Sequence, residues 1–236
     1  MRTLVLCYHA VATGEPQRLA VSRDSLESKI RSLLRRGYVP VTAADAVERH
    51  GRLFHVTFDD AYRSVVEALP FLLELGVPAT IFACTSYARD GRPFDVPELR
   101  DDAAADPDAF ATMNWAALRD AASVGVEIAS HTVSHPHLPQ LSDAELDQEL
   151  RDSKAELEDE LGAPCRHLAY PYGEQDDRVR EAARRAGYDA AFAVAPGRAR
   201  SDPFALPRHA VYRHDSAVGF RLRTSRLGWR FAVGDG

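Results

Sequence analysis

Short apolar runs alternate with longer amphipathic segments along this chain of 236 residues, and this alternation restricts the fold more than any other feature. The apolar runs have the length of buried strands, and the segments between them have helical spacing. Strands that alternate with helices are typical of parallel sheets with helical crossovers. The predicted strands are residues 3–8, 53–58, 78–84, 126–130, 166–170, 189–194 and 205–211, and the predicted helices are residues 24–36, 62–75, 114–124, 142–161 and 175–186.

Residues that begin and end helices support this assignment. Ser142 and Glu145 have the spacing of a capping box at the start of one predicted helix. Gly76 and Gly187 follow two others, where glycine is a common stop signal. About seven strand–helix units predict a (β/α) barrel or a doubly wound sheet. Because we find no internal repeat and no linker, we expect residues 1–236 to form a single α/β domain.

The segment 86–112 interrupts the alternation. It is long, acidic and rich in glycine, proline and aspartate. Long irregular insertions in compact domains are often functional, and the alternative is a disordered surface excursion. The segment follows the predicted strand 78–84, so it leaves the sheet from a strand's carboxyl end. We therefore expect it beside the active face, where it would influence the choice of substrate.

Composition argues against several partners and locations. A net charge of −6 gives no support for nucleic-acid binding. The apolar run in MRTLVLCYHA is too short for a signal peptide or a membrane span. Cys7, Cys84 and Cys165 each lie in an apolar run and are expected to be buried free thiols. We therefore expect a cytoplasmic protein with no membrane or nucleic-acid partner, and the sequence leaves its oligomeric state open.

Polar residues follow four of the predicted strands, at the point where each strand ends. The carboxyl ends of parallel barrel strands lie on one face, and the active sites of such barrels are built there. We therefore expect these residues to share one active face. They are Asp59 and Asp60, His131 and His135, Pro171 and Tyr172, and Arg208 and His209.

Two of these clusters suggest a metal site. His131 and His135 are four residues apart, which on a helical turn places both imidazoles on one side. The alternative is a pair of capping or surface histidines in a polar loop. Two adjacent carboxylates at the end of a buried strand are costly without a charge partner. One of Asp59 and Asp60 can complete a set of two histidines and one carboxylate, while the other holds a proton. A helix cap is the alternative, but it explains only one aspartate.

The segments TFDDAYRS, SHTVSHPHL and YPYG, in that order, resemble the first three motifs of the polysaccharide deacetylase family, carbohydrate esterase family four. LCYHAV, PATIFAC, NWAALRDAASVGVEIASH and LPRHAV are also similar to that family, so the resemblance extends from about residue 4 to residue 211. It implies a distorted (β/α) barrel, here with about seven parallel strands. It also implies a divalent metal ion, usually zinc, and hydrolysis of N-acetyl groups on amino sugars.

The resemblance further implies a role for each motif residue. Asp59 corresponds to the catalytic base, and Asp60, His131 and His135 correspond to the metal ligands. The aromatic residue after the motif proline lines the acetyl pocket, and its backbone N–H helps to hold the oxyanion. The expected substrate-binding residues are therefore Pro171 and Tyr172.

Two departures from the family pattern concern the catalytic groups. Many members have an arginine where this chain has Ala169, and we expect Arg208 to supply that charge to Asp59 instead. The alternative is that Arg208 pairs with a surface acid such as Asp202 or Asp215.

The family's late motif, which supplies a general-acid histidine, is not evident in this sequence. His209 and His214 are the nearest candidates, and a bystander role is the alternative for each. His9 ends the first predicted strand and is expected either beside the active groups or as a buried structural histidine.

The leading functional hypothesis is a metal-dependent deacetylase of an N-acetylated sugar, in a polysaccharide, an oligosaccharide or a glycoconjugate. One alternative is a deacetylase of a small-molecule amide or ester in cytoplasmic biosynthesis. The other is a carbohydrate-binding protein without catalytic activity. The intact set of Asp59, Asp60, His131 and His135 argues against that second alternative, because a degenerate site should have lost some of these residues.

Overall fold

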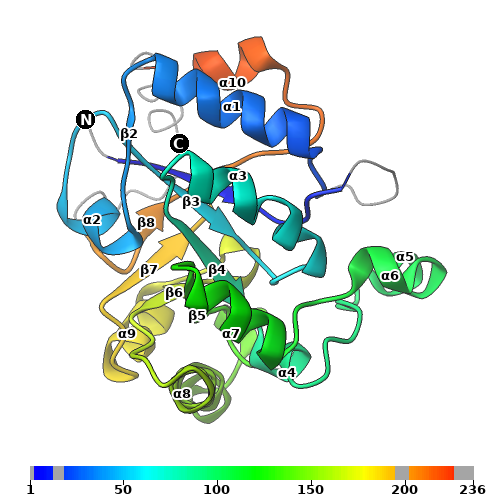
Figure 1. Ribbon diagram of the computed structural model, residues 1–236. Helices are drawn as coiled ribbons and strands as arrows, with labels where there is room; N and C mark the ends of the chain where they lie inside the picture. Colours follow the sequence, from blue (N-terminus) through cyan, green and yellow to red (C-terminus); the bar gives the residue numbers. More distant parts are fainter. Residues whose placement is uncertain (1–2, 13–18, 195–201, 226–236) are drawn as a thin grey trace.

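A nearly closed barrel of parallel strands forms the centre of the computed structural model, which describes residues 3–12, 19–194 and 202–225 (Figure 1). Neighbouring strands follow the order β8-β7-β6-β5-β4-β3-β1-β9, and β2 pairs separately with β3. The strands are β1 (Leu4–Tyr8), β2 (Val39–Pro40), β3 (Leu53–Phe58), β4 (Ala79–Ala83), β5 (Glu127–Ser130), β6 (His167–Ala169), β7 (Ala190–Ala193), β8 (Leu206–Pro207) and β9 (His209–Ala210).

One extended segment near the end of the chain closes the ring. Its first part, β8, pairs with β7, and its second part, β9, pairs with β1. The backbone N–H of Arg208, between the two parts, donates to the Ala193 carbonyl at 2.8 Å, and the Val211 N–H donates to the Cys7 carbonyl at 2.9 Å. The prediction of a distorted barrel is confirmed, and the doubly wound sheet is excluded.

Helices surround the barrel, as Figure 1 shows. Among the described residues, no helix is both long and apolar enough to cross a membrane. The α-helices are α1 (Arg23–Arg35), α2 (Ala43–Glu48), α3 (Leu69–Glu74), α4 (Thr85–Ala88), α5 (Arg100–Ala105), α6 (Pro107–Phe110), α7 (Trp115–Ser123), α8 (Asp143–Leu161), α9 (Asp177–Arg185) and α10 (Ala217–Arg223), and the 3₁₀ helices are η1 (Arg63–Glu67), η2 (Leu138–Gln140) and η3 (Pro171–Gly173).

The predicted helix over residues 62–75 is wrong as a single element. The chain forms η1 first, and α3 then begins with Pro70 in its first turn. Proline has no backbone N–H and is tolerated only at the start of a helix, so one helix cannot continue through this position. By contrast, the predicted capping box of α8 is present, because Ser142 and Glu145 each bond the other's backbone N–H.

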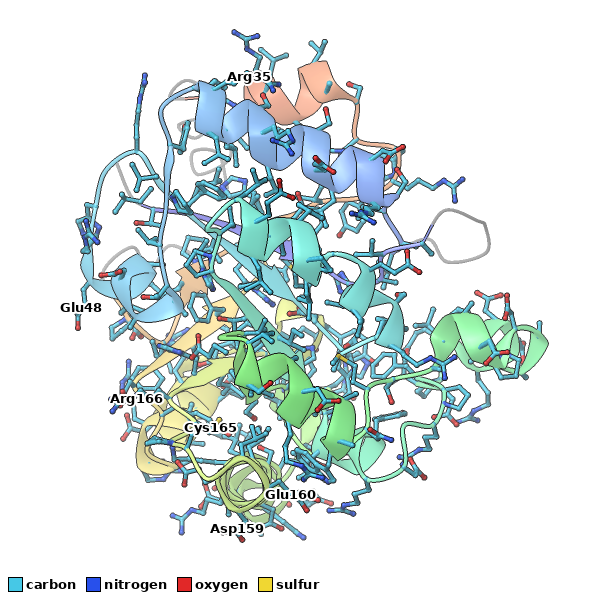
Figure 2. The ribbon with its side chains drawn as sticks, viewed as in Figure 1. Arg35, Glu48, Asp159, Glu160, Cys165 and Arg166 are labelled. Carbon is cyan, nitrogen blue, oxygen red and sulfur yellow. The ribbon has the colours of Figure 1, made fainter. Side chains whose placement is uncertain are left out.

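Two apolar clusters stabilise the fold. The larger one lies between the strands and the surrounding helices, and the smaller one includes Phe82, Ala129, Ala169 and Phe192 from β4 to β7. Because alternate residues of a barrel strand face its interior, we assign this smaller cluster to the interior. Figure 2 shows that charged side chains such as those of Arg35 and Asp159 project outward from the helices, where both residues are exposed.

A polar layer crosses four adjacent strands near their amino ends. His55 Nδ1 lies 2.8 Å from the Val41 carbonyl, and His55 Nε2 lies 2.9 Å from Thr80 Oγ1. The Thr80 hydroxyl lies 2.6 Å from a Glu127 carboxylate oxygen, and the other oxygen lies 2.5 Å from His167 Nδ1. Buried polar groups in a barrel must be hydrogen-bonded, and this chain of contacts provides the partners.

Candidate metal centre and active site

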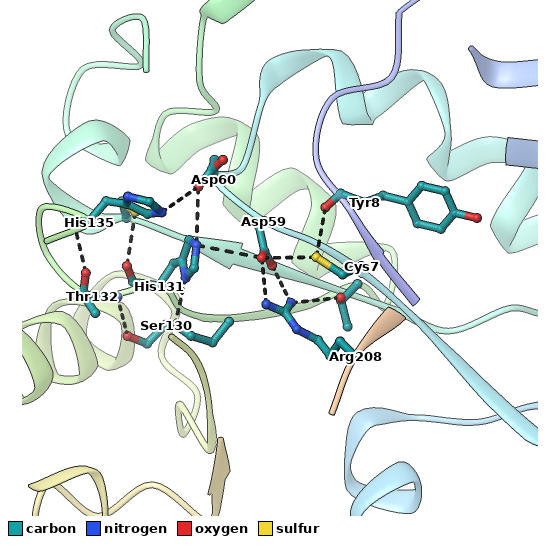
Figure 3. Close-up of polar contacts among 12 residues, drawn as sticks. Cys7, Tyr8, Asp59, Asp60, Ser130, His131, Thr132, His135 and Arg208 are labelled. Carbon is teal, nitrogen blue, oxygen red and sulfur yellow. Dashed lines mark hydrogen bonds and ion pairs between the residues drawn. The ribbon is translucent and has the colours of Figure 1, made fainter. Parts of the chain in front are cut away.

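Residues from all four polar clusters meet at the carboxyl ends of the barrel strands. Asp59 and Asp60 follow β3, His131 follows β5, Tyr172 follows β6, and Arg208 lies between β8 and β9. A cavity of about 350 Å³ opens beside them and is lined by both aspartates, both histidines of the second motif and Tyr172. Figure 3 shows the aspartates lying between the two histidines and Arg208.

Asp60, His131 and His135 form a group that fits one cation. Asp60 Oδ1 lies 3.4 Å from His131 Nε2 and 3.6 Å from His135 Nε2, and all three ligand atoms lie within 4.8 Å of one another. Tetrahedral zinc with bonds of about 2.1 Å places neighbouring ligand atoms about 3.4 Å apart. Asp60 Oδ1 is buried without a hydrogen-bond partner. A divalent cation would satisfy this orphaned oxygen and the Nε2 atoms of both imidazoles together.

The protonation of the histidines also suits a cation. His131 Nδ1 lies 2.8 Å from the Ala169 carbonyl. A carbonyl only accepts, so Nδ1 carries a proton, and Nε2, which faces Asp60, is the nitrogen left to bind a cation. Burial lowers the pKa of His135 to about 4, which keeps this imidazole neutral. Burial disfavours the charged form of His131, but the nearby aspartates outweigh it and raise the pKa above its ordinary value, so this part of the site attracts positive charge, whether a proton or a metal ion.

A loop rather than a helix presents the two histidines, so the explanation of their spacing by a helical turn is wrong. His135 and Thr132 have φ values of 62° and 71°. These values lie in the left-handed region, which residues other than glycine seldom adopt. The Thr132 hydroxyl accepts the His135 N–H at 3.1 Å, and Ser130 Oγ accepts the Thr132 N–H at 3.1 Å. Glu149 on α8 accepts the backbone N–H and the hydroxyl of Ser134. These bonds hold the loop in its unusual conformation.

Backbone strain is concentrated at this site. Within the ranges that the structure describes, five residues other than glycine have positive φ, and all of them are site residues or their chain neighbours: Asp60, Ala61, Thr132, His135 and Tyr172. Such conformations cost about 1–3 kcal/mol each and persist only where the surroundings enforce them. The strain therefore marks the region where side-chain placement takes precedence over local stability.

Asp59 and Arg208 form a buried bidentate ion pair, the contact that the missing motif arginine led us to predict. Arg208 Nη1 donates to Asp59 Oδ1 at 2.6 Å, and Nη2 donates to Oδ2 at 2.7 Å. Asp59 is 2% exposed and Arg208 is 3% exposed. The surface acids considered as alternatives have other partners: Asp202 pairs with Arg184 and Asp215 pairs with Arg223.

The surroundings of this ion pair keep Asp59 ionised. Burial raises the pKa of Asp59, but the Arg208 guanidinium outweighs it and holds the pKa well below its ordinary value. Arg208 is fixed by a third hydrogen bond, to Thr57 Oγ1 at 3.1 Å, and it lies over the Phe82 ring at 5.3 Å from its centroid. Ala169, which stands at the position of the family's arginine, belongs to the apolar interior together with Phe82.

Tyr172 forms one wall of the cavity. Its ring lies 4.5 Å from the His135 ring and stacks on His137 at 4.0 Å. Its hydroxyl donates to Glu98 at 3.0 Å. Pro171 is buried at the start of η3 and is not among the cavity-lining residues, so it positions the turn instead of facing the cavity.

The predicted general-acid candidates do not reach the cavity, whereas His9 does. His209 follows Arg208 directly along an extended segment, so its side chain points to the opposite face. Burial, followed by the charge of Arg223, lowers the pKa of His209 to about 4. His214 stacks on Tyr212 at 5.6 Å, and neither His209 nor His214 lines the cavity. His9 lines it together with Asp59, as its place at the end of β1 suggested.

The segment 86–112 lies beside the active face, as predicted, and it is not simply a disordered excursion. It contains α5 and α6, and Phe94, Val96 and Glu98 line the cavity. Sequence reasoning missed these individual residues, as well as Tyr212. The sequence feature that could have indicated them is the apolar pair within an acidic segment. Phe94 and Val96 are two residues apart, so in an extended backbone both side chains point to the same side.

Comparisons with known proteins agree with this geometry. The family model described as polysaccharide deacetylase matches residues 46–191, which is more than half of the chain. YxkH, a candidate polysaccharide deacetylase of Bacillus subtilis (strain 168), is 25% identical over 215 residues, covering 88% of this chain and 70% of that protein. A chitooligosaccharide deacetylase of Sinorhizobium fredii (strain NBRC 101917 / NGR234) is 28% identical over 138 residues, covering 56% of this chain and 53% of that protein.

Solved structures share the fold at low sequence identity. The Streptococcus pyogenes deacetylase PplD, in complex with acetate, has a TM-score of 0.78 and 21% identity, covering 95% of this chain and 99% of that one. IcaB from Ammonifex degensii has a TM-score of 0.75 and 22% identity, covering 99% of this chain and 97% of that one. At these identities the likeness concerns the fold alone.

Proposed function

Because this chain belongs to the polysaccharide deacetylase family, we propose that it is a metal-dependent hydrolase that removes the N-acetyl group from an amino sugar. The observation that carries the proposal is the orphaned Asp60 Oδ1, which faces two imidazole nitrogens beside a carboxylate that Arg208 keeps ionised. Asp60, His131 and His135 would hold the ion, and zinc suits this set of donors. When bound, the ion would polarise the acetyl carbonyl and lower the pKa of water.

Asp59 is the proposed general base. It is ionised and aimed by two hydrogen bonds from Arg208, and Oδ2 lies 3.9 Å from His131 Nε2, next to the proposed ligands. From this position it takes the proton of the water that attacks the amide carbonyl. Arg208 does not contact the substrate in this mechanism, because its two terminal nitrogens, Nη1 and Nη2, are already bonded to Asp59 and Thr57. We therefore assign it a positioning role.

His9 is the proposed proton donor for the leaving amine. Cleavage of the amide bond yields acetate and an amine, and the nitrogen must gain a proton as it leaves. Among the residues that line the cavity, His9 is the remaining imidazole once His131 and His135 are assigned to the ion. The Tyr172 backbone N–H is proposed to donate a hydrogen bond to the oxyanion, as the family motif implies.

The walls of the cavity support an amino-sugar ring as substrate. Phe94, Val96 and Leu99 form an apolar side, and Tyr172, which also lines the cavity, is 37% exposed. Sugar rings have apolar faces that pack on aromatic rings, and polar edges that bond carboxylates such as Glu98. The name of the Sinorhizobium fredii relative, a chitooligosaccharide deacetylase, supports the same class of substrate.

An acetate-release assay on the metal-depleted and zinc-restored protein tests the proposal. We expect acetate from N-acetylglucosamine oligomers only after zinc is restored, and one bound ion per chain by metal analysis. A parallel panel of small N-acetyl amides and acetyl esters tests the alternative substrate class. Acetate release from sugars at an undiminished rate without metal would contradict the proposed mechanism, and release from the small amides or esters alone would contradict the proposed substrate.

A further inference from the structure

A second group of potential metal ligands adjoins the first and takes no part as a group in the proposed reaction. Cys7, His9 and Asp59 present a sulfur, an imidazole nitrogen and a carboxylate oxygen that all lie within 4.8 Å of one another. Cys7 is fully buried in β1, and its thiol donates to Asp59 Oδ2 with an Sγ–Oδ2 distance of 3.4 Å. His9 and Asp59 both line the cavity, so an ion could reach the group from there.

We propose that Cys7, His9 and Asp59 form a second cation site, selective for thiophilic divalent ions, and that an ion bound there stops the reaction. The site goes beyond the proposed function, because it uses the base and the proton donor in place of the three ligands of the first ion. Cadmium and excess zinc are the expected occupants.

The distances suit such an ion. Zinc bonds of about 2.3 Å to sulfur and about 2.1 Å to oxygen place the two ligand atoms about 3.6 Å apart in a tetrahedron, close to the 3.4 Å between Cys7 Sγ and Asp59 Oδ2. Arg208 occupies one direction at each Asp59 oxygen. A carboxylate offers about four lone-pair directions, so Asp59 can bond Arg208 and an ion together.

The charges explain why the thiol decides the selectivity. Arg208 cancels the charge of Asp59, so a cation approaching the pair alone meets no net negative charge. When the ion binds, the Cys7 S–H bond breaks, the proton leaves to solvent, and the thiolate electron pair forms the bond to the ion. The thiolate then supplies the missing negative charge. Soft ions such as cadmium and zinc favour thiolate, whereas magnesium and manganese favour oxygen ligands.

Cadmium binding to the intact protein tests the site directly. We expect equilibrium dialysis to find two cadmium ions per chain, and titration to develop the ultraviolet absorption of a cadmium–thiolate bond. Cys7→Ser should bind one ion and show no such absorption. Cys165→Ser is the matched control: it removes another buried thiol, near the amino end of β6, and should behave like the unaltered protein. Lack of the absorption in the unaltered protein, or its persistence in Cys7→Ser, would overturn the proposal.

A variant of the first site separates this proposal from the proposed function. His135→Ala removes one ligand of the first ion, and we expect it to keep the cadmium–thiolate absorption. Loss of that absorption would show that Cys7 belongs to the first site, and it would overturn a separate second site. Excess zinc should inhibit acetate release by the unaltered protein, and Cys7→Ser should need at least a tenfold higher zinc concentration for the same inhibition. Equal inhibition of both would overturn the inhibitory role.

Discussion

Arg208 donates one hydrogen bond to each oxygen of the Asp59 carboxylate, and both residues are almost fully buried. A base in this position must be ionised before the substrate arrives, and the guanidinium ensures that over the whole neutral range. Asp60, one residue later, is turned away by its positive φ and faces the imidazoles instead. Adjacent residues of the same type thus have different partners and different proposed roles.

Asp59→Asn should retain the metal ion and lose turnover. The amide keeps the shape of the side chain but cannot take a proton, so we expect kcat to fall at least ~100-fold. Metal content, measured on the same preparation, should remain at one ion per chain, because Asp60 and the two histidines are unchanged. Activity comparable to that of the unaltered protein would remove Asp59 from the mechanism.

Arg208→Ala should move the acid limb of the pH–activity profile to higher pH. Arg208 is the charge that lowers the pKa of Asp59 against the effect of burial, so its removal raises that pKa, and the base becomes protonated at higher pH. Arg208→Lys should keep the charge but lose the bidentate geometry, so its acid limb should lie between those of the unaltered protein and Arg208→Ala. Metal content should persist in both variants, and an unshifted acid limb in Arg208→Ala would count against the positioning role.

At the scale of elements, the insertion 86–112 and the turn η3 meet across the cavity through Glu98 and Tyr172. His137, near the end of the second motif segment, stacks on the same tyrosine and lies 3.7 Å from the same carboxylate. Three segments from different parts of the chain therefore share one contact. This contact fixes the ring that walls the cavity, and it links the substrate side of the site to the insertion.

Glu98→Ala should change the substrate profile more than the metal content. Without the carboxylate, the Tyr172 ring loses its hydroxyl partner and the cavity loses a polar edge, so we expect KM for sugar oligomers to rise several-fold. Asp101→Ala, an exposed substitution on α5 of the same insertion, is the control and should leave KM unchanged. An equal effect of both variants would mean that the insertion acts only through its overall charge.

Elements that depend on local sequence were predictable, and those that depend on distant contacts were not. The strand 53–58 was predicted with its observed bounds, because the mostly apolar run LFHVTF ends at two adjacent aspartates. The loop that carries His131 and His135 was not, because Glu149 from a later helix bonds Val133 and Ser134, which lie between its two left-handed residues. Likewise, no local sequence pattern predicts the hydrogen bond between Glu98 and Tyr172, because that contact depends on the path of the whole insertion.

At the scale of the whole molecule, the polar layer near the amino ends of the strands makes stability depend on pH. Burial lowers the pKa of His55 to about 4, whereas an unfolded histidine titrates near pH 6.5. Between these values the unfolded chain binds a proton that the folded protein does not. Stability is therefore lost as pH falls from about 6.5 to about 4, by at most about 3 kcal/mol from this residue.

His55→Gln should flatten that dependence. Glutamine keeps polar atoms near Val41 and Thr80 but does not titrate, so urea unfolding between pH 4 and pH 7 should show a shallower slope for the variant. The exposed His50→Gln is the control, and it should retain the slope of the unaltered protein. If the two variants gave the same slope, the acid sensitivity would come from groups other than His55.

The extended segment that carries β8 and β9 also has a consequence for the newly made protein. Until this segment leaves the ribosome, β7 and β1 each present an unpaired edge, which is a template for association with other chains. Asp59 lacks its guanidinium over the same interval, because Arg208 lies in the middle of this segment. Closure of the barrel and pairing of Asp59 with Arg208 therefore occur together. A chain truncated before residue 206 would be prone to aggregation and would lack activity.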